Sequence, residues 1–265
     1  MVTDKATFKM CSRFAFSNDE FELIKQGSGM PGPTDLRWYI STTDNVVSIL
    51  RTVGNLVAFK IPFEKLGDNY ISEYAYSVFD VSCGDLEKEI QRQNYRNYWI
   101  YSWITQLIFH KPRIFEIETL LFQSKIDFNS VHGFIHWSNV NRIGTQLSTD
   151  IDLNVLFYFS VFHDFFRLND YTDVEHGKRA KEVMEKQILY LDESQRAKLL
   201  FALENHDLEP KRFNNVMSFL RNDKTVRLCI DSDRLDLGRV GVQPSAEYLL
   251  TEEAKEYLIK SKATL

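Results

Sequence analysis

The chain has 265 residues, of which 44% are hydrophobic, so it can bury a sizeable core as one large domain or two small ones. Its formal net charge of -5 at pH 7 excludes the broad basic surface that duplex nucleic acid or an anionic membrane requires. A small anionic substrate held by a metal remains compatible with this charge. We expect two domains.

The cysteines and the N-terminus indicate the compartment. Cys11, Cys83 and Cys229 are too few and too scattered for a disulfide framework, and they form no CxxC pair. The first residues, MVTDKATFKMCSRF, contain no apolar region of signal-peptide length. The most apolar stretch, residues 98–109, is interrupted by polar side chains. These features predict a cytoplasmic protein with free thiols and no membrane segment.

Residues 1–124 are rich in aromatic residues and turn signals. The run GSGMPGP at 27–33 predicts a loop, because glycine and proline together prevent a continuous helix or a central strand. Residues 36–40 and 56–61 mix β-branched, aromatic and polar residues over strand-like lengths. We therefore predict an α+β domain of unknown role here. It carries no chemical motif, and binding of a protein partner is among its possible roles.

Residues 125–265 have a different hydrophobic pattern, with long amphipathic or apolar stretches broken by polar loops. This pattern predicts an all-helical domain. Asp192 and Gln195 have the spacing of a capping box, which predicts a helix from about 193 to 206. The boundary between the two parts, near residues 120–128, rests on this change in hydrophobic pattern alone.

The histidines are concentrated in this second part, where five of the six lie between residues 132 and 206. The segment 151–166, IDLNVLFYFSVFHDFF, is almost wholly apolar until it reaches His163 and Asp164. A buried helix would therefore carry an imidazole and a carboxylate into the interior, which is costly unless both are paired. A divalent cation would pair them, and so would a direct hydrogen bond between them.

Two further segments would place polar groups among apolar neighbours. A helix around His136 puts Val140 on the same face, so this imidazole should point inward. His132 lies one turn earlier and could be a second ligand, a partner of a ligand or a packing residue. A helix over residues 225–238 would place the carboxylate of Asp233 on its apolar face.

The same C-terminal helix contains two more aspartates with candidate supporting roles beside the ligands. Asp231 should point away from the apolar face and form an ion pair with Arg227 or Arg234, one turn away. Asp236 lies three residues after Asp233 and could orient a ligand.

The order His136, then His163-Asp164, then Asp233 resembles the H…HD…D pattern of the HD superfamily of metal-dependent phosphohydrolases, over roughly residues 130–245. HWSNV resembles the helix of the first ligand, VFHDFF the signature dyad and SDRLDL the helix of the last ligand. The resemblance implies an all-α HD-type domain. It also implies that these four residues bind a divalent transition metal such as Mn, Fe, Zn, Co or Ni.

Some HD proteins carry further histidines between the dyad and the last aspartate, and these bind a second metal. His176 in EHGKRA and His206 in LENHD lie in comparable stretches, so the resemblance implies a candidate second site. His206 shares an apolar face with Leu199 and Leu203, which favours an inward position, although a hydrogen-bonded core histidine would lie there too. His176 could approach a metal or cap a turn.

The resemblance implies hydrolysis of a nucleotide or another small phosphorylated substrate by a metal-activated water. Asp164 is the candidate general base, because it could bind the metal and accept a proton. Arg167 is the candidate catalytic and substrate-binding arginine that follows the dyad, and Lys178 and Arg179 are further candidate phosphate contacts. The alternative for Arg167 is a surface ion pair with Asp170 or Asp173.

Departures from the family patterns narrow the substrate. The acidic pair typical of alarmone hydrolases is not reproduced after the dyad, and the glycine-tyrosine-proline signature of cyclic-dinucleotide phosphodiesterases is missing after His206. Two other functions stay open. One is a non-catalytic HD-type module that binds or senses nucleotides, and the other is a di-iron oxygenase.

Overall fold

The computed structural model of the protein describes residues 8–28, 38–51, 56–79, 84–110, 120–121, 123–187 and 189–263. The chain divides into two compact units. Unit 1 comprises Met1–Phe122 with Asp127–Asn129, and unit 2 comprises Gln123–Ile126 with Ser130–Leu265. None of the helices described here is both long enough and apolar enough to cross a membrane.

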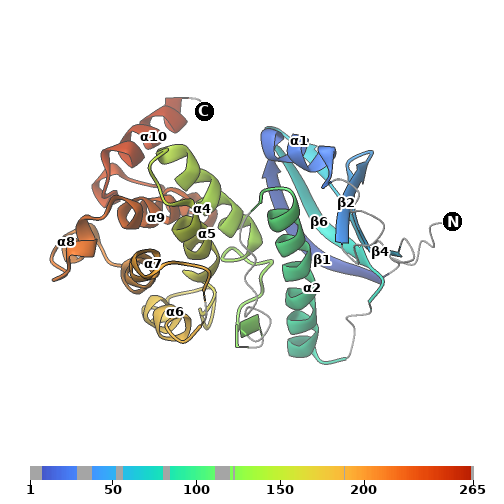
Figure 1. Ribbon diagram of the computed structural model, residues 1–265, viewed down its shortest axis with the longest axis horizontal. Helices are drawn as coiled ribbons and strands as arrows, with labels where there is room; N and C mark the ends of the chain where they lie inside the picture. Colours follow the sequence, from blue (N-terminus) through green and yellow to red (C-terminus); the bar gives the residue numbers. More distant parts are fainter. Residues whose placement is uncertain are drawn as a thin grey trace. The chain divides into compact units, whose positions relative to one another are not determined.

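Unit 1 contains an antiparallel sheet with strand order β1-β6-β4-β3-β2, and β5 pairs with β6 (Figure 1). The alternating burial of β6 is typical of a strand with one face in the core. The strands are β1 (Phe8–Ser17), β2 (Trp38–Thr43), β3 (Val46–Arg51), β4 (Leu56–Pro62), β5 (Glu64–Leu66) and β6 (Asn69–Ser77).

Unit 1 also contains helices α1 and α2. Helix α1 (Asn18–Gln26) begins with a capping box formed by Ser17 and Glu20. Helix α2 (Leu86–Leu107) begins after the N-cap Asp85 and contacts β1 and β2. The predicted α+β composition is therefore confirmed. The predicted strand at 56–61 is β4 and that at 36–40 overlaps β2, whereas residues 29–37, with most of the predicted loop, lie outside the described residues.

Unit 2 is helical, as predicted. Helix α5 contacts α4, α7 and α9, α9 also contacts α4 and α7, and α6 packs on α7 (Figure 1). The helices are α4 (Phe134–Leu147), α5 (Leu153–Phe162), α6 (His176–Met184), α7 (Glu193–Asn205), α8 (Pro210–Asn214), α9 (Lys224–Leu235) and α10 (Glu252–Ala263), with the 3-10 turns η2 (Phe219–Asn222), η3 (Leu237–Val240) and η4 (Ala246–Tyr248).

Side-chain caps fix where three of these helices begin. Asp152 accepts hydrogen bonds from the first backbone N–H groups of α5, and Asp223 does the same for α9. The predicted capping box of Asp192 and Gln195 is present at the start of α7, which confirms that helix. Because α5 is buried from Val155 onward and apolar all round, it forms the centre of the unit.

Helices α6 and α7 approach each other closely at Gly177. A Cβ atom at this position would lie 2.5 Å from the backbone oxygen of Leu203 and 3.1 Å from ring atoms of His206. We expect Gly177→Ala to lower the free energy of unfolding by about 2 kcal/mol, because overpacking against backbone outweighs the better helix propensity of alanine. Urea denaturation measures this change.

Gly238→Ala is the matched control, because a Cβ atom at Gly238 would have no neighbour within 4 Å. We expect its free energy of unfolding to stay within about 0.5 kcal/mol of wild type. Equal effects of the two substitutions would show that α6 and α7 do not pack through Gly177.

Candidate metal centre

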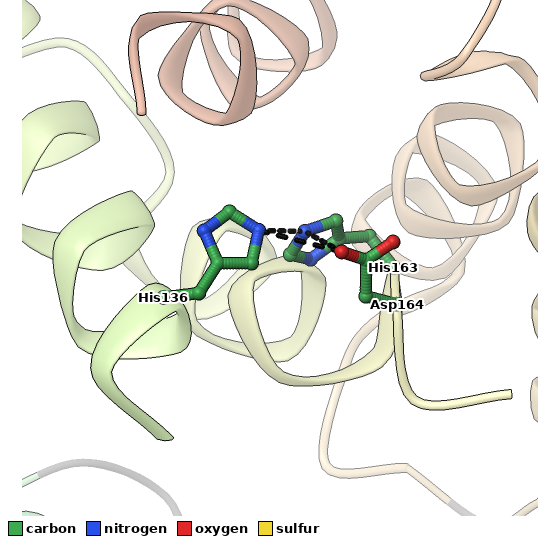
Figure 2. Close-up of side chains that lie close together, drawn as sticks. All are labelled: His136, His163 and Asp164. Carbon is green, nitrogen blue, oxygen red and sulfur yellow. Dashed lines mark hydrogen bonds and ion pairs between the residues drawn. The ribbon is translucent and has the colours of Figure 1, made fainter. Parts of the chain in front are cut away.

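Three helices of unit 2 bring the first group of polar side chains together. His136 comes from the first turn of α4, His163 and Asp164 follow the last residue of α5, and Asp233 lies in the last turn of α9. Three of these side chains are buried, with His163 0% and Asp164 2% exposed, whereas Asp233 is 13% exposed. Figure 2 shows the rings of His136 and His163 and the Asp164 carboxylate turned toward one another.

The distances in this first group are those of ligand atoms around one point. The Nε2 atoms of His136 and His163 lie 2.8 Å apart. Oδ1 of Asp233 lies 3.3 Å from Nε2 of His136 and 3.6 Å from Nε2 of His163. Oδ2 of Asp164 lies 3.5 Å and 3.7 Å from the same two nitrogens. The structure thus brings together the four residues of the predicted first ligand set.

A second group lies on the other side of Asp164. His176 is the first residue of α6 and His206 is the C-cap of α7, and both are buried. Their Nε2 atoms lie 2.8 Å apart, and Oδ1 of Asp164 lies 3.3 Å from Nε2 of His176. Asp164 therefore belongs to both groups.

Hydrogen bonds determine which nitrogens of the first pair carry protons. Nδ1–H of His136 donates to the Asp236 carboxylate over 2.7 Å, and Nδ1–H of His163 donates to the carbonyl oxygen of Phe159 over 3.0 Å. In the neutral rings, both Nε2 atoms then present lone pairs. Two lone pairs 2.8 Å apart repel each other in a dry interior unless a proton or a metal cation lies between them.

The second pair repeats this arrangement. Nδ1–H of His206 donates to the carbonyl oxygen of Leu203 over 2.9 Å, and Nδ1–H of His176 donates to the carbonyl oxygen of Asp173. Burial, together with the neighbouring His176 and His163, lowers the pKa of His206 to about 3, so its ring is neutral at pH 7. A neutral imidazole is the form that binds a metal.

The donor set fits a divalent transition metal. Imidazole nitrogen and carboxylate oxygen are the ligands that Mn, Fe, Co, Ni and Zn accept in proteins. At metal–nitrogen distances of about 2.1 Å, two nitrogens at right angles around one ion lie about 3 Å apart. Both histidine pairs have nearly this separation, 2.8 Å.

No protein-family model, curated protein or solved structure matches this chain. The structure itself shows two pairs of buried histidines, each of which could hold a divalent metal together with the carboxylate of Asp164 that they share.

The two aspartates are held as carboxylates. Burial alone would raise the pKa of Asp164, but the neighbouring His163, His132 and His176 outweigh it and hold the pKa well below its ordinary value. The same balance holds for Asp233, where the neighbouring His136 and His163 outweigh burial and lower the pKa. A carboxyl group of such low pKa is ionised and is therefore in the form that binds a cation.

His132 and Asp236 lie directly behind the ligands. His132 lies in the turn before α4, where its Nδ1–H donates to Oδ2 of Asp164 over 2.6 Å. Its backbone oxygen accepts from the indole of Trp137, which fixes the turn. Asp236 accepts from His136 and from the amide of Asn139. Of the three interpretations of His132, this geometry corresponds to a partner of a ligand.

Asp231 does not reach the histidines. Its carboxylate accepts hydrogen bonds from the backbone N–H of Leu250 and from the backbone N–H and hydroxyl of Thr251, all over 2.7–2.8 Å. The predicted ion pair with Arg234 is loose at 3.9 Å, and Arg227 donates to the backbone oxygen of Leu250 instead. Asp231 therefore ties α9 to the segment before α10 and does not support the ligands.

A cavity of about 570 Å³ opens onto both groups. Arg167 lines it, with Nη1 3.4 Å from Oδ1 of Asp164 and 3.4 Å from Nε2 of His176. The two other predicted phosphate contacts lie outside the lining. The side chain of Lys178 is exposed beside Glu175, and Arg179 pairs with Asp173.

Two lining residues were not indicated by the sequence pattern. Arg239 contacts the carboxylates of Asp164 and Asp233, and burial raises the pKa of Asp207 beside His206. The only sequence signal for either residue was its position. Asp207 follows the candidate ligand His206 directly, and Arg239 lies six residues after the last candidate ligand, Asp233. Such spacing occurs too often to indicate a site by itself.

Proposed function

We propose that the helical unit is a phosphohydrolase of the HD type that uses two divalent metals. The observation that carries the proposal is the position of Asp164 between two histidine pairs, each with its Nε2 atoms 2.8 Å apart. A carboxylate that bridges two metals, with two imidazoles on each side, is a common arrangement for hydrolysis at a pair of metals. The H…HD…D order of the ligands along the chain supports the same reaction class.

The proposed ligands form two sets, one on each side of the shared aspartate. A divalent metal in such a site lowers the pKa of a bound water and neutralises a phosphoryl oxygen. Within the chain, His132 and Asp236 orient Asp164 and His136 through hydrogen bonds of 2.6 Å and 2.7 Å. The first set is His136, His163, Asp164 and Asp233, and the second is Asp164, His176 and His206.

The proposed substrate is a small phosphate ester, with nucleotides as the leading class. The cavity of about 570 Å³ has the size of a small-molecule site. Its inner end is charged, with Arg167 beside Asp164, and its lining also includes Tyr171, Tyr248 and Val242, which are exposed. Such a surface accommodates a flat, partly apolar group attached to a phosphate.

Metal content per chain tests the proposal. We expect wild type incubated with manganese to hold two ions and to hydrolyse p-nitrophenyl phosphate or bis-p-nitrophenyl phosphate. His163→Ala should lose the first ion and His206→Ala the second, because each removes one of two imidazoles from its group. Turnover should fall by more than about 100-fold in both, since even residues that only orient ligands contribute 10- to 100-fold.

His110→Asn is the matched control. His110 is exposed, lies in unit 1 and has a positive φ of 52°, which asparagine tolerates. It should keep both ions and full turnover. Metal-free wild type after incubation with manganese, iron or zinc would contradict the ligand assignment. Nucleotide binding without products would favour a sensing module, and oxygen consumption without phosphate release would favour a di-iron oxygenase.

A further inference from the structure

Arg239 reaches the metal centre from a short turn outside the predicted ligand helices. It lies in η3, and its side chain is only 13% exposed. Nε donates to the backbone oxygen of Val131 over 2.9 Å, and Nη1 donates to that of Asp236 over 3.2 Å. These two bonds fix the guanidinium plane and leave Nη2 directed at the site.

Among the residues that the structure describes, Nη2 of Arg239 makes only long contacts. It lies 3.4 Å from Oδ2 of Asp164 and 3.5 Å from Oδ1 of Asp233. Charge-assisted hydrogen bonds between a guanidinium and a carboxylate are normally about 2.7–2.9 Å long. The positive charge is therefore close to both ligand carboxylates without being consumed by a short bond to either.

Arg167 and Arg239 bracket Asp164. Oδ1 of Asp164 has Arg167 at 3.4 Å and His176 at 3.3 Å, whereas Oδ2 has Arg239 at 3.4 Å and His136 at 3.5 Å. Each histidine group thus has one arginine beside it, and both arginines line the same cavity. The two arginines also offset the negative charges of Asp164 and Asp233. The positive charge of any bound metals would then be available to attract an anionic substrate.

A third arginine in the lining has a different role. The two terminal nitrogens of Arg234 donate to the backbone oxygens of Tyr248 and Leu208. Burial lowers the pKa of Arg234, whereas Asp231 and Asp233 raise it only in part. Arg234 therefore holds together the segments that contain Leu208 and Tyr248. Arg167 and Arg239 are then the two arginines of the cavity lining that can contact a substrate.

We propose that Arg239 binds the substrate phosphate together with Arg167 and thereby selects phosphate monoesters over diesters. This inference rests on the proposed function of the site. A monoester carries about two negative charges near neutral pH, since its second pKa is about 6, whereas a diester carries one. Paired cations near the reacting group favour the dianion, and Nη2 of the fixed Arg239 guanidinium can donate a charge-assisted hydrogen bond to it.

Arg239→Gln tests the proposal in the full-length, manganese-loaded protein, with inorganic phosphate as the binding probe. We expect calorimetry to show at least about tenfold weaker phosphate binding, the usual effect of losing a charge-assisted hydrogen bond. KM for p-nitrophenyl phosphate should rise by a similar factor, whereas KM for bis-p-nitrophenyl phosphate should rise less than about threefold. Arg239→Lys, which keeps the charge, should fall between wild type and Arg239→Gln.

Lys178→Gln is the matched control, because it removes one positive charge from an exposed position outside the cavity. Its phosphate affinity should stay within about twofold of wild type, which separates a contact from long-range attraction. All variants should hold two manganese ions and unfold at the wild-type temperature.

Three results would overturn the inference. The first is unchanged phosphate affinity in Arg239→Gln. The second is loss of manganese from that variant, because Arg239 would then serve to hold the ligand carboxylates. The third is absence of phosphate binding by the wild type. A wild type that binds phosphate but hydrolyses neither ester would refute the proposed function and leave the calorimetry to decide on Arg239.

Discussion

We expect Asp164→Asn to abolish binding of both metal ions, whereas His206→Ala should lose one. The reason is that Asp164 offers one carboxylate oxygen to each histidine group, and asparagine has a single oxygen of weaker donor strength. Hydrolysis of p-nitrophenyl phosphate should fall by more than about 100-fold. Metal content per chain, measured after incubation with manganese and desalting, checks the first result.

Asp170→Asn provides the matched control for this variant. Asp170 lines the same cavity, but it is exposed and its carboxylate accepts from the hydroxyl of Ser130. The control should keep two ions per chain. Retention of one ion by Asp164→Asn would show that the aspartate serves a single metal and would refute its bridging position.

The helices that the sequence predicted best are those whose ends are marked by local chemistry. Asp192 and Gln195 form the expected capping box, so α7 begins where the spacing indicated. The apolar segment from residue 151 forms the central helix α5, which ends at Phe162 and presents His163 and Asp164 in the interior. In both places, short-range patterns and burial point to the same structure.

The grouping of the histidines was only partly predictable. The apolar surroundings of His163 and Asp164 show in the sequence, because both follow a run of buried residues. The contact between His176 and His206 does not, since it depends on how α6 packs against α7 across 30 residues of chain. A local pattern placed each histidine near a helix end, but tertiary packing brought their Nε2 atoms together.

The cations near the site show where a sequence pattern fails. Lys178 and Arg179 follow the dyad closely, but α6 turns Lys178 to solvent, because the neighbouring Gly177 faces α7. Arg239 lies much later in the chain and enters the site because the η3 turn folds back to the backbone of Val131. Position along the chain therefore indicated Arg167, which lines the cavity, but not Arg239.

Asp231 and Asp233 lie two residues apart on α9, but removal of their carboxylates should affect different properties. Removal at Asp231 should lower stability, and removal at Asp233 should lower metal binding. We expect Asp231→Ala to lower the free energy of unfolding by about 3 kcal/mol, because it leaves buried donors of Leu250 and Thr251 without an acceptor. Asp233→Ala should lower it by less than Asp231→Ala does in the metal-free protein, since no backbone donor depends on the Asp233 carboxylate in the hydrogen bonds described.

Metal binding should show the reverse order. Asp233→Ala removes a ligand of the first group and should lose an ion, whereas folded Asp231→Ala should keep two, because its carboxylate faces the segment before α10. Asp231→Asn should be less destabilising than Asp231→Ala, because asparagine keeps one acceptor oxygen. It also removes a buried negative charge, whose burial raises the pKa of Asp231. Urea denaturation in EDTA and metal content after manganese loading separate the two roles. If Asp231→Ala lost metal at full stability, Asp231 would belong to the metal centre after all.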